Sequence, residues 1–279
     1  MAMAMTPTET SSVLKQLEHR PRKNLGQNFL VDSNIVEKSL KLAQVSQGDS
    51  IVEIGPGLGT LTETLLQAGA HVWAIEYDPK LTDHLRTHLL PQYPETLNLM
   101  EGDALDHPRA NLTESIVTES GYKVVANLPY AISTPWLDAM LQTPLATRMV
   151  LMLQREAADR FAADPGSKQF GSISIFLQSV YAIDPGHKVP ANCFFPRPDV
   201  ESYLLNIRLK SDPFLFDSKT KTLIRECFQQ RRKQIGALLR KKLPDGGKSW
   251  IDSLRNEGLD HRARPEQIST VAWQRLKAE

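Results

Sequence analysis

The sequence predicts an α/β fold followed by a smaller, basic helical region. Short apolar runs rich in β-branched residues alternate with segments whose apolar residues recur at helical spacing. The first such run leads directly into a glycine-rich turn and then into a helical segment, the arrangement found in nucleotide-binding α/β proteins. After residue 210 the character changes, because Lys and Arg become frequent among helically spaced apolar residues.

The composition is that of a globular protein. Of the 279 residues, 41% are hydrophobic and 23% are charged. No apolar run approaches the roughly 20 residues that span a bilayer, and the first residues lack the apolar core of a secretory signal. Cys193 and Cys227 fit a reducing compartment, so we expect a cytoplasmic protein. The cysteines offer no metal-binding spacing, and the seven histidines are expected to be scattered without the i, i+4 pairing of a metal-binding helix, so no metal site is expected.

Six strands are expected from the apolar runs, at residues 51–54, 72–75, 97–100, 122–126, 149–153 and 203–209. The first is followed by Gly55-Pro56-Gly57-Leu58-Gly59, where glycines let the backbone approach a ligand closely. A dinucleotide-binding loop would have glycine at position 60, but Thr60 stands there. The turn therefore predicts a ligand site without favouring a pyrophosphate.

Polar side chains end three successive strands. Glu76 lies about 20 residues after Gly55, the distance at which a carboxylate binds ribose hydroxyls in nucleotide-binding proteins. Asp103 can accept from an adenine amine, or it simply caps a turn. Asn127 follows the fourth strand. Since ligands bind at the carboxyl ends of strands in open α/β sheets, these side chains predict a site at one sheet edge.

Asn127-Leu128-Pro129-Tyr130 indicates chemistry on a planar nitrogen base. The Asn127 amide can pair with an exocyclic amine. Pro129 biases Leu128 toward an extended backbone whose carbonyl can face a pocket, and Tyr130 offers a ring on which a base can stack. Asn and Pro are also common turn formers, so a simple strand-to-loop turn is the alternative.

The segment at residues 22–32 combines basic residues, the amides of Gln27 and Asn28, a glycine and apolar anchors. It is either a hydrogen-bonded loop before a helix or a lid whose amides meet a ligand. Asp32 or Ser33 is expected to cap the helix that follows.

The net charge of +1 hides a basic segment. Residues 210–248 hold 11 Lys and Arg against 4 Asp and Glu, with a dense group at Arg231, Arg232 and Lys233. This clustering predicts a polyanionic partner, and a solvated helical face is the alternative. We expect a flexible extension at residues 1–20, an α/β domain at 21–210 and a basic helical domain at 211–279.

Together these motifs resemble the ribosomal RNA adenine N6-dimethyltransferases, and within that family the bacterial small-subunit branch. The motifs occur in one order: Lys23-x-Leu-Gly-Gln-Asn-Phe-Leu30, Glu53-Ile-Gly-Pro-Gly-x-Gly59, Gly102-Asp103-Ala104, Asn127-Leu-Pro-Tyr130, Phe195-Pro-x-Pro-x-Val200 and Arg231-Arg-Lys233. Two positions depart from the family pattern, because Phe170 stands where tyrosine is usual and Arg155 where lysine is common.

The resemblance implies a Rossmann-like class I methyltransferase domain with a seven-stranded mixed sheet, and an all-α C-terminal domain. It implies S-adenosylmethionine as methyl donor and, as substrate, two adjacent adenosines near the 3′ end of 16S rRNA in a precursor of the small ribosomal subunit. The residues implied to bind the donor are Asn28, Leu30, Gly55, Glu76, Asp103 and Asn127. Catalysis is assigned to Asn127, Leu128, Pro129 and Tyr130, and rRNA binding to Arg231, Arg232 and Lys233, in a protein expected to be a monomer.

Two other functions remain open. A large-subunit rRNA adenine N6-methyltransferase of the antibiotic-resistance type shares the fold and much of the Asn127 motif. A non-catalytic RNA-binding assembly factor on the same fold is the second alternative. A nicotinamide dehydrogenase is disfavoured by Thr60.

Overall fold

The computed structural model describes residues 4–22, 25–115, 117, 121–243 and 245–278, so Lys23 of the first motif lies outside the described residues. The chain divides into two compact units. The first, here called the sheet unit, comprises Met1–Ala158 and Ile183–Leu209. The second, here called the helical unit, comprises Asp159–Ala182 and Lys210–Glu279.

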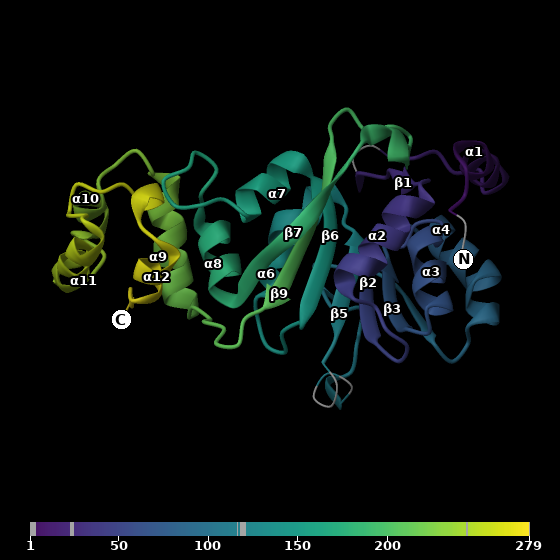
Figure 1. Cartoon of the computed structure of the whole chain (residues 1–279), viewed down its shortest axis with the longest axis horizontal. Helices are drawn as coiled ribbons and strands as arrows, with labels where there is room; N and C mark the ends of the chain where they lie inside the picture. Colours follow the sequence, from purple (N-terminus) through teal and green to yellow (C-terminus); the bar gives the residue numbers. More distant parts are fainter. Residues whose placement is uncertain (1–3, 23–24, 116, 118–120, 244, 279) are drawn as a thin grey trace. The chain divides into compact units, whose positions relative to one another are not determined.

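A seven-stranded mixed sheet forms the centre of the sheet unit (Figure 1). Its strands in chain order are β2 (Ser50–Ile54), β3 (His71–Glu76), β4 (Leu97–Glu101), β5 (Lys123–Asn127), β6 (Arg148–Gln154), β7 (Tyr181–Val189) and β9 (Ser202–Leu209). The spatial order is β4-β3-β2-β5-β6-β9-β7. The pairs from β4 to β6 are parallel and the β6–β9 pair is antiparallel, which confirms the predicted sheet.

Helices pack on the parallel strands, and aspartate side chains cap the starts of two of them. α2 (Ser33–Ala43) contacts β5 and β6, α3 (Thr60–Gln67) contacts β3, and α4 (Pro79–His88) contacts β3 and β4 (Figure 1). Asp32 caps α2, as predicted, by accepting from the N–H groups of Asn34 and Ile35. The strands β2, β3, β5 and β6 are largely buried, which explains why they are continuous apolar runs.

The segment that we expected to be a flexible extension contains a helix within its described residues 4–20. Pro7–Gln16 form α1, and Thr6 and Glu9 close a capping box at its start. Leu14 is 3% exposed and packs against Phe29, Leu58 and Leu81. This apolar contact fixes the helix on the sheet unit.

The helical unit has an aromatic core of its own. α8 (Ser172–Val180) packs against α9 (Ser218–Gln229) and α12 (Thr270–Gln274) (Figure 1). Phe170 is fully buried and meets Phe228 at a centroid distance of 6.3 Å. An apolar ring suits this position, since a buried tyrosine hydroxyl would need a hydrogen-bond partner.

The other α-helices and strands of the described residues are β1 (Phe29–Leu30), β8 (Phe194–Phe195), α6 (Ser133–Met140), α7 (Arg155–Phe161), α10 (Ile235–Leu239) and α11 (Lys248–Ser253). Asp159–Ala182 belongs to the same compact unit as the C-terminal helices. The domain boundary predicted at residue 210 places this segment in the α/β domain instead. That boundary remains a prediction. No helix within the described ranges is long and apolar enough to span a membrane.

Candidate active site

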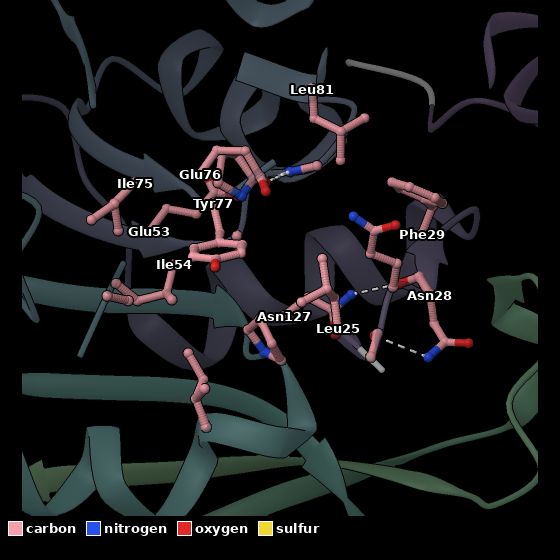
Figure 2. A pocket seen from close by; sticks show the side chains of 18 of the residues that line it. Leu25, Asn28, Phe29, Glu53, Ile54, Ile75, Glu76, Tyr77, Leu81 and Asn127 are labelled. Carbon is pink, nitrogen blue, oxygen red and sulfur yellow. Dashed lines mark hydrogen bonds between the residues drawn. The ribbon is translucent and has the colours of Figure 1, made fainter. Parts of the chain in front are cut away.

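A cavity of about 320 Å³ lies in the sheet unit, at the carboxyl ends of the parallel strands. Figure 2 shows side chains from three regions around it. Glu76 lies at the end of β3, Asn127 lies at the end of β5, and Asn28 and Phe29 come from the segment at residues 22–32, here called the lid. The predicted donor residues that line it are Asn28, Leu30, Gly55, Glu76, Asp103 and Asn127, and Pro129 lines it as well. The structure thus brings together every residue that the sequence predicted for the donor.

Glycines allow the loops around the cavity to touch. Gly55 and Gly57 have φ values of +67° and +63°, which glycine adopts without strain. A β-carbon at Gly55 would come within 3.3 Å of the Pro129 ring, and one at Gly57 within 3.2 Å of Phe29. The glycine loop therefore lies against the lid on one side and against the Asn127 motif on the other.

Glu76 is held by backbone amides. One carboxylate oxygen accepts from the Gly57 N–H at 3.0 Å and the other from the Asp78 N–H at 2.9 Å (Figure 2 shows Glu76 at the cavity). Burial raises the pKa of Glu76, while the hydrogen bonds from Asp78 and Gly57 act in the opposite direction. Each oxygen keeps a second lone pair, so the carboxylate can still accept from a ligand hydroxyl.

Glu53 is a cavity residue that we did not predict as a site residue. It lies at the β2 end, is 1% exposed, and has a carboxylate oxygen without a hydrogen-bond partner among the described residues. Burial raises the pKa of Glu53 to about 8. Its place within an apolar strand hid it, although a charged residue in such a run is a usable signal of function.

Asn127 is oriented by the lid. Its Nδ2 donates to the backbone carbonyl of Asn28 at 2.9 Å (Figure 2). Because the amide nitrogen is bound to the lid, the amide oxygen is the end of Asn127 that can accept from a substrate amine.

Leu128 and Tyr130 do not line the cavity. Leu128 is fully buried and its N–H donates to the Met152 carbonyl at 3.2 Å. The Tyr130 hydroxyl forms a hydrogen bond of 2.8 Å with Ser202 Oγ. Burial raises the pKa of Tyr130, and the bond with Ser202 opposes this shift. Tyr130 is therefore fixed at its hydroxyl end, and its neighbours Ala131 and Ile132 line the cavity.

Asp103 lines the cavity and also makes a local turn contact. It lines the cavity just beyond β4, and its Oδ1 accepts from the Leu105 N–H at 2.8 Å. This local bond fixes the turn. One carboxylate oxygen is engaged in the turn, which leaves the other to meet a ligand.

The lid is paired to the proline-rich loop. Phe29 of β1 pairs with Phe195 of β8 in antiparallel register. The Asn28 side chain donates to the Gly26 carbonyl at 3.1 Å, which shapes the segment just before this pair. The segment is therefore both a hydrogen-bonded loop and a wall of the cavity.

The predicted rRNA-binding residues lie in the helical unit. Arg231 donates to the Lys168 carbonyl at 2.9 Å and lies 3.8 Å from Glu266, so part of its role is structural. Arg232 and Lys233 are exposed. Arg232 shares a polar pocket with Arg262 and Arg264, two arginines that the sequence analysis did not single out.

A family model for ribosomal RNA adenine dimethylase matches residues 18–273. The chain is 58% identical to a ribosomal RNA small subunit methyltransferase A of Opitutus terrae, over 99% of each chain. It is 39% identical to a protein of the same description from Chlamydia caviae, over 97% of this chain and 96% of the other. The chain belongs to the ribosomal RNA adenine dimethylase family.

A solved structure agrees at the level of the fold. A dimethyladenosine transferase from Plasmodium falciparum superimposes with a TM-score of 0.72 at 23% identity, covering 88% of this chain and 94% of that chain. As a ribosomal RNA adenine dimethylase, the chain is a methyltransferase whose donor is S-adenosylmethionine and whose substrate is ribosomal RNA. The predicted family, fold, enzyme class and donor are confirmed.

One expectation about histidines was wrong. His84 and His88 stand four residues apart on α4, with ring centroids 4.5 Å apart. Within the part of the chain that the structure describes, no group of three or more His, Cys, Asp and Glu side chains is arranged to hold a metal ion.

Proposed function

We propose that this dimethylase transfers methyl groups from S-adenosylmethionine to N6 of two adjacent adenosines near the 3′ end of small-subunit rRNA. The observation that carries the proposal is Asn127 at the cavity, with its amide nitrogen bound to the lid and its oxygen left to face a substrate. The relatives described as small subunit methyltransferases support the choice of rRNA.

The cavity residues fit the donor. Its volume of about 320 Å³ is within the range of small-molecule sites. Glu53 offers a buried carboxyl oxygen without a hydrogen-bond partner among the described residues, and this oxygen can accept from a polar group of the donor. Gly55 and Gly57 form a cradle that a β-carbon would obstruct. S-adenosylmethionine supplies a methyl group already activated by its sulfonium charge.

The residues at the strand ends bind different parts of the donor. Glu76 accepts from the ribose hydroxyls, since its oxygens have lone pairs beyond those used by Gly57 and Asp78. Asp103 accepts from the adenine amine. Asn28 and Leu30 cover the donor from the lid, and Gly55 lies beside its methionine part.

The chemistry is mainly a matter of positioning. The lone pair of an adenine N6 amine is delocalised into the ring, so the amine is a poor nucleophile. The Asn127 oxygen and the Leu128 backbone carbonyl accept the two amine hydrogens, which favours a more tetrahedral nitrogen with its lone pair directed at the donor. Pro129 holds Leu128 extended. No strong base is required first, because the methylated cation loses its proton readily.

Tyr130, whose neighbours line the donor cavity although its own ring does not, holds the flipped base by stacking beside that cavity. Its hydrogen bond with Ser202 fixes the ring before the base arrives, so little side-chain freedom is lost on binding. Because two methyl groups are added, the site must leave room around N6 for the first one.

The helical unit supplies the contact with rRNA. Arg231, Arg232 and Lys233 are the proposed phosphate-binding residues. The pocket that Arg232 shares with Arg262 and Arg264 supports this role, since several guanidinium groups in one pocket suit phosphate oxygens. We further propose that the enzyme acts as a cytoplasmic monomer on a precursor of the small subunit.

A methyl-transfer assay tests the proposal. Radiolabelled S-adenosylmethionine is incubated with the enzyme and either unmethylated small subunits or large subunits. Label in small-subunit rRNA supports the proposal. Label confined to large subunits would identify the antibiotic-resistance type instead, and no label in either would favour a non-catalytic assembly factor.

A further inference from the structure

His19 lies in a buried hydrogen-bond network that joins the N-terminal segment to the lid. Its side chain is 2% exposed. Its Nε2 lies 3.0 Å from Gln27 Oε1, and its Nδ1 lies 3.8 Å from Oδ2 of the fully buried Asp78. One side chain therefore faces both a lid residue that lines the cavity and the carboxylate that caps α4.

The proton positions in this network follow from the backbone. Gln27 Oε1 also accepts from the Arg22 N–H at 2.8 Å, and a backbone N–H can only donate. This identifies the oxygen end of the Gln27 amide, whose Nε2 then donates to Asp78 at 3.3 Å. His19 must accordingly donate from Nε2, because Gln27 Oε1 can only accept.

The network continues to the proposed ribose-binding residue. The Asp78 N–H donates to Glu76 at 2.9 Å, and Asp78 Oδ1 accepts from the Lys80 N–H at 3.0 Å. Lys80 Nζ returns to the N-terminal segment by donating to the Glu18 carbonyl at 2.9 Å. His19 is thus connected to Glu76 by hydrogen bonds through Gln27 and Asp78.

Apolar packing supports the same region. Leu14 of α1 packs against Phe29, Leu58 and Leu81, and all three of these line the cavity. The segment that ends in His19 therefore contacts the cavity wall through an apolar side chain and the lid through a hydrogen bond.

We infer that His19 is a positioning residue of the methyl-donor site, which holds the lid closed against Asp78 by donating to Gln27. The inference rests on the proposed function, since it takes this cavity to be the donor site. Without the hydrogen bond from His19 to Gln27, the lid must become ordered when S-adenosylmethionine binds. The free-energy cost of that ordering lowers the affinity for S-adenosylmethionine.

Three substitutions separate the hydrogen bond from the bulk of the ring. His19→Leu removes the hydrogen-bonding N–H group but still fills the space of the ring. His19→Asn places an amide at the Nδ1 position only, so the donation to Gln27 is lost while the site stays polar. His19→Gln places an N–H at the Nε2 position and keeps it. His71→Leu, at the exposed opposite end of β3 from Glu76, is the matched control.

The measurements are the dissociation constant for S-adenosylmethionine by titration calorimetry, kcat at saturating donor, and the thermal unfolding midpoint. We expect His19→Leu and His19→Asn to weaken donor binding by roughly tenfold, the effect of one buried hydrogen bond. His19→Gln should restore most of the affinity, and kcat at saturating donor should not change. His71→Leu should match the wild type.

The outcomes are distinguishable. A wild-type protein that does not bind the donor would overturn the proposed function and the inference with it. If the wild type binds, equal affinity in folded His19→Asn overturns the inference alone. Equal weakening in His19→Gln and His19→Asn would also overturn it, because loss of the ring and not of the donated hydrogen would then be responsible.

Discussion

Asn127 is the residue on which the proposed chemistry depends. Asn127→Ala removes the oxygen that accepts from N6, so kcat should fall by at least about 100-fold, the usual effect of losing a group that acts mainly in the transition state. Donor affinity should stay within about tenfold, since only the contact with Asn28 is lost from the lid. Single-turnover kinetics with calorimetry checks both. A parallel loss of donor affinity and rate would contradict this role.

Glu53 predicts a pH dependence of stability. Its pKa in the folded protein is about 8, against 4.5 for an ordinary glutamate. The favourable burial of the protonated form is fully present below pH 4.5 and is lost as pH rises toward about 8. The unfolding midpoint of the protein without donor should therefore fall across this window, and Glu53→Gln should flatten the fall. An identical slope in both proteins would exclude Glu53 as the cause.

At the residue scale, the sequence predicted the cavity residues that lie at strand ends. Glu76, Asp103 and Asn127 were found because parallel strands bring their carboxyl ends to one edge. Glu53 was missed because position alone does not reveal burial. The buried, hydrogen-bonded state of His19 was hidden for another reason: it depends on Gln27 and Asp78, and contacts this distant in sequence leave no local pattern.

At the element scale, the glycine loop leaves little room for a β-carbon at Gly57. Gly57→Ala places a β-carbon 3.2 Å from Phe29 at a φ of +63°. We expect donor affinity to fall by roughly tenfold, because the lid must shift, and stability to fall by about 1 kcal/mol from backbone strain.

Gly48→Ala is the matched control for that experiment. Gly48 has a φ of +84° but no atom within 4 Å of the added β-carbon. It should lose similar stability yet bind the donor like the wild type. Calorimetry and thermal unfolding on both variants decide. Equal donor affinities in the two variants would mean that close approach to the lid has no part in binding.

Two elements show the limits of prediction from the sequence. β7 contains Pro185 and Gly186 and has only its two end residues buried, so it lacks the alternation of a strand. It lies at the sheet edge, where such residues are tolerated. α1 was overlooked although Thr6-x-x-Glu9 with Pro7 is a capping-box signature that indicates a helix start.

At the scale of the whole molecule, basic residues are concentrated in the helical unit, where residues 210–248 hold 11 Lys and Arg against 4 Asp and Glu. The double variant Arg232→Ala and Lys233→Ala should weaken binding to small subunits and flatten its dependence on salt, by about one unit of slope for each lost phosphate contact. Donor affinity should not change. Arg231 is left intact because it holds Lys168.

Arg86→Ala, which removes an exposed arginine paired with Asp83 in the sheet unit, is the control for non-specific charge loss. Binding is measured by filter retention across a salt series. An unchanged salt slope in the double variant would remove Arg232 and Lys233 from the rRNA contact.

The proposed function requires this enzyme to dimethylate two neighbouring adenosines of small-subunit rRNA. The most direct measurement is to map the methylated nucleotides, by primer extension and nucleoside mass spectrometry, after unmethylated small subunits react with the enzyme and S-adenosylmethionine. We expect N6,N6-dimethyladenosine at two adjacent positions near the 3′ end, and none with Asn127→Ala. A single modified adenosine elsewhere, or dimethylation that persists in Asn127→Ala, would contradict it.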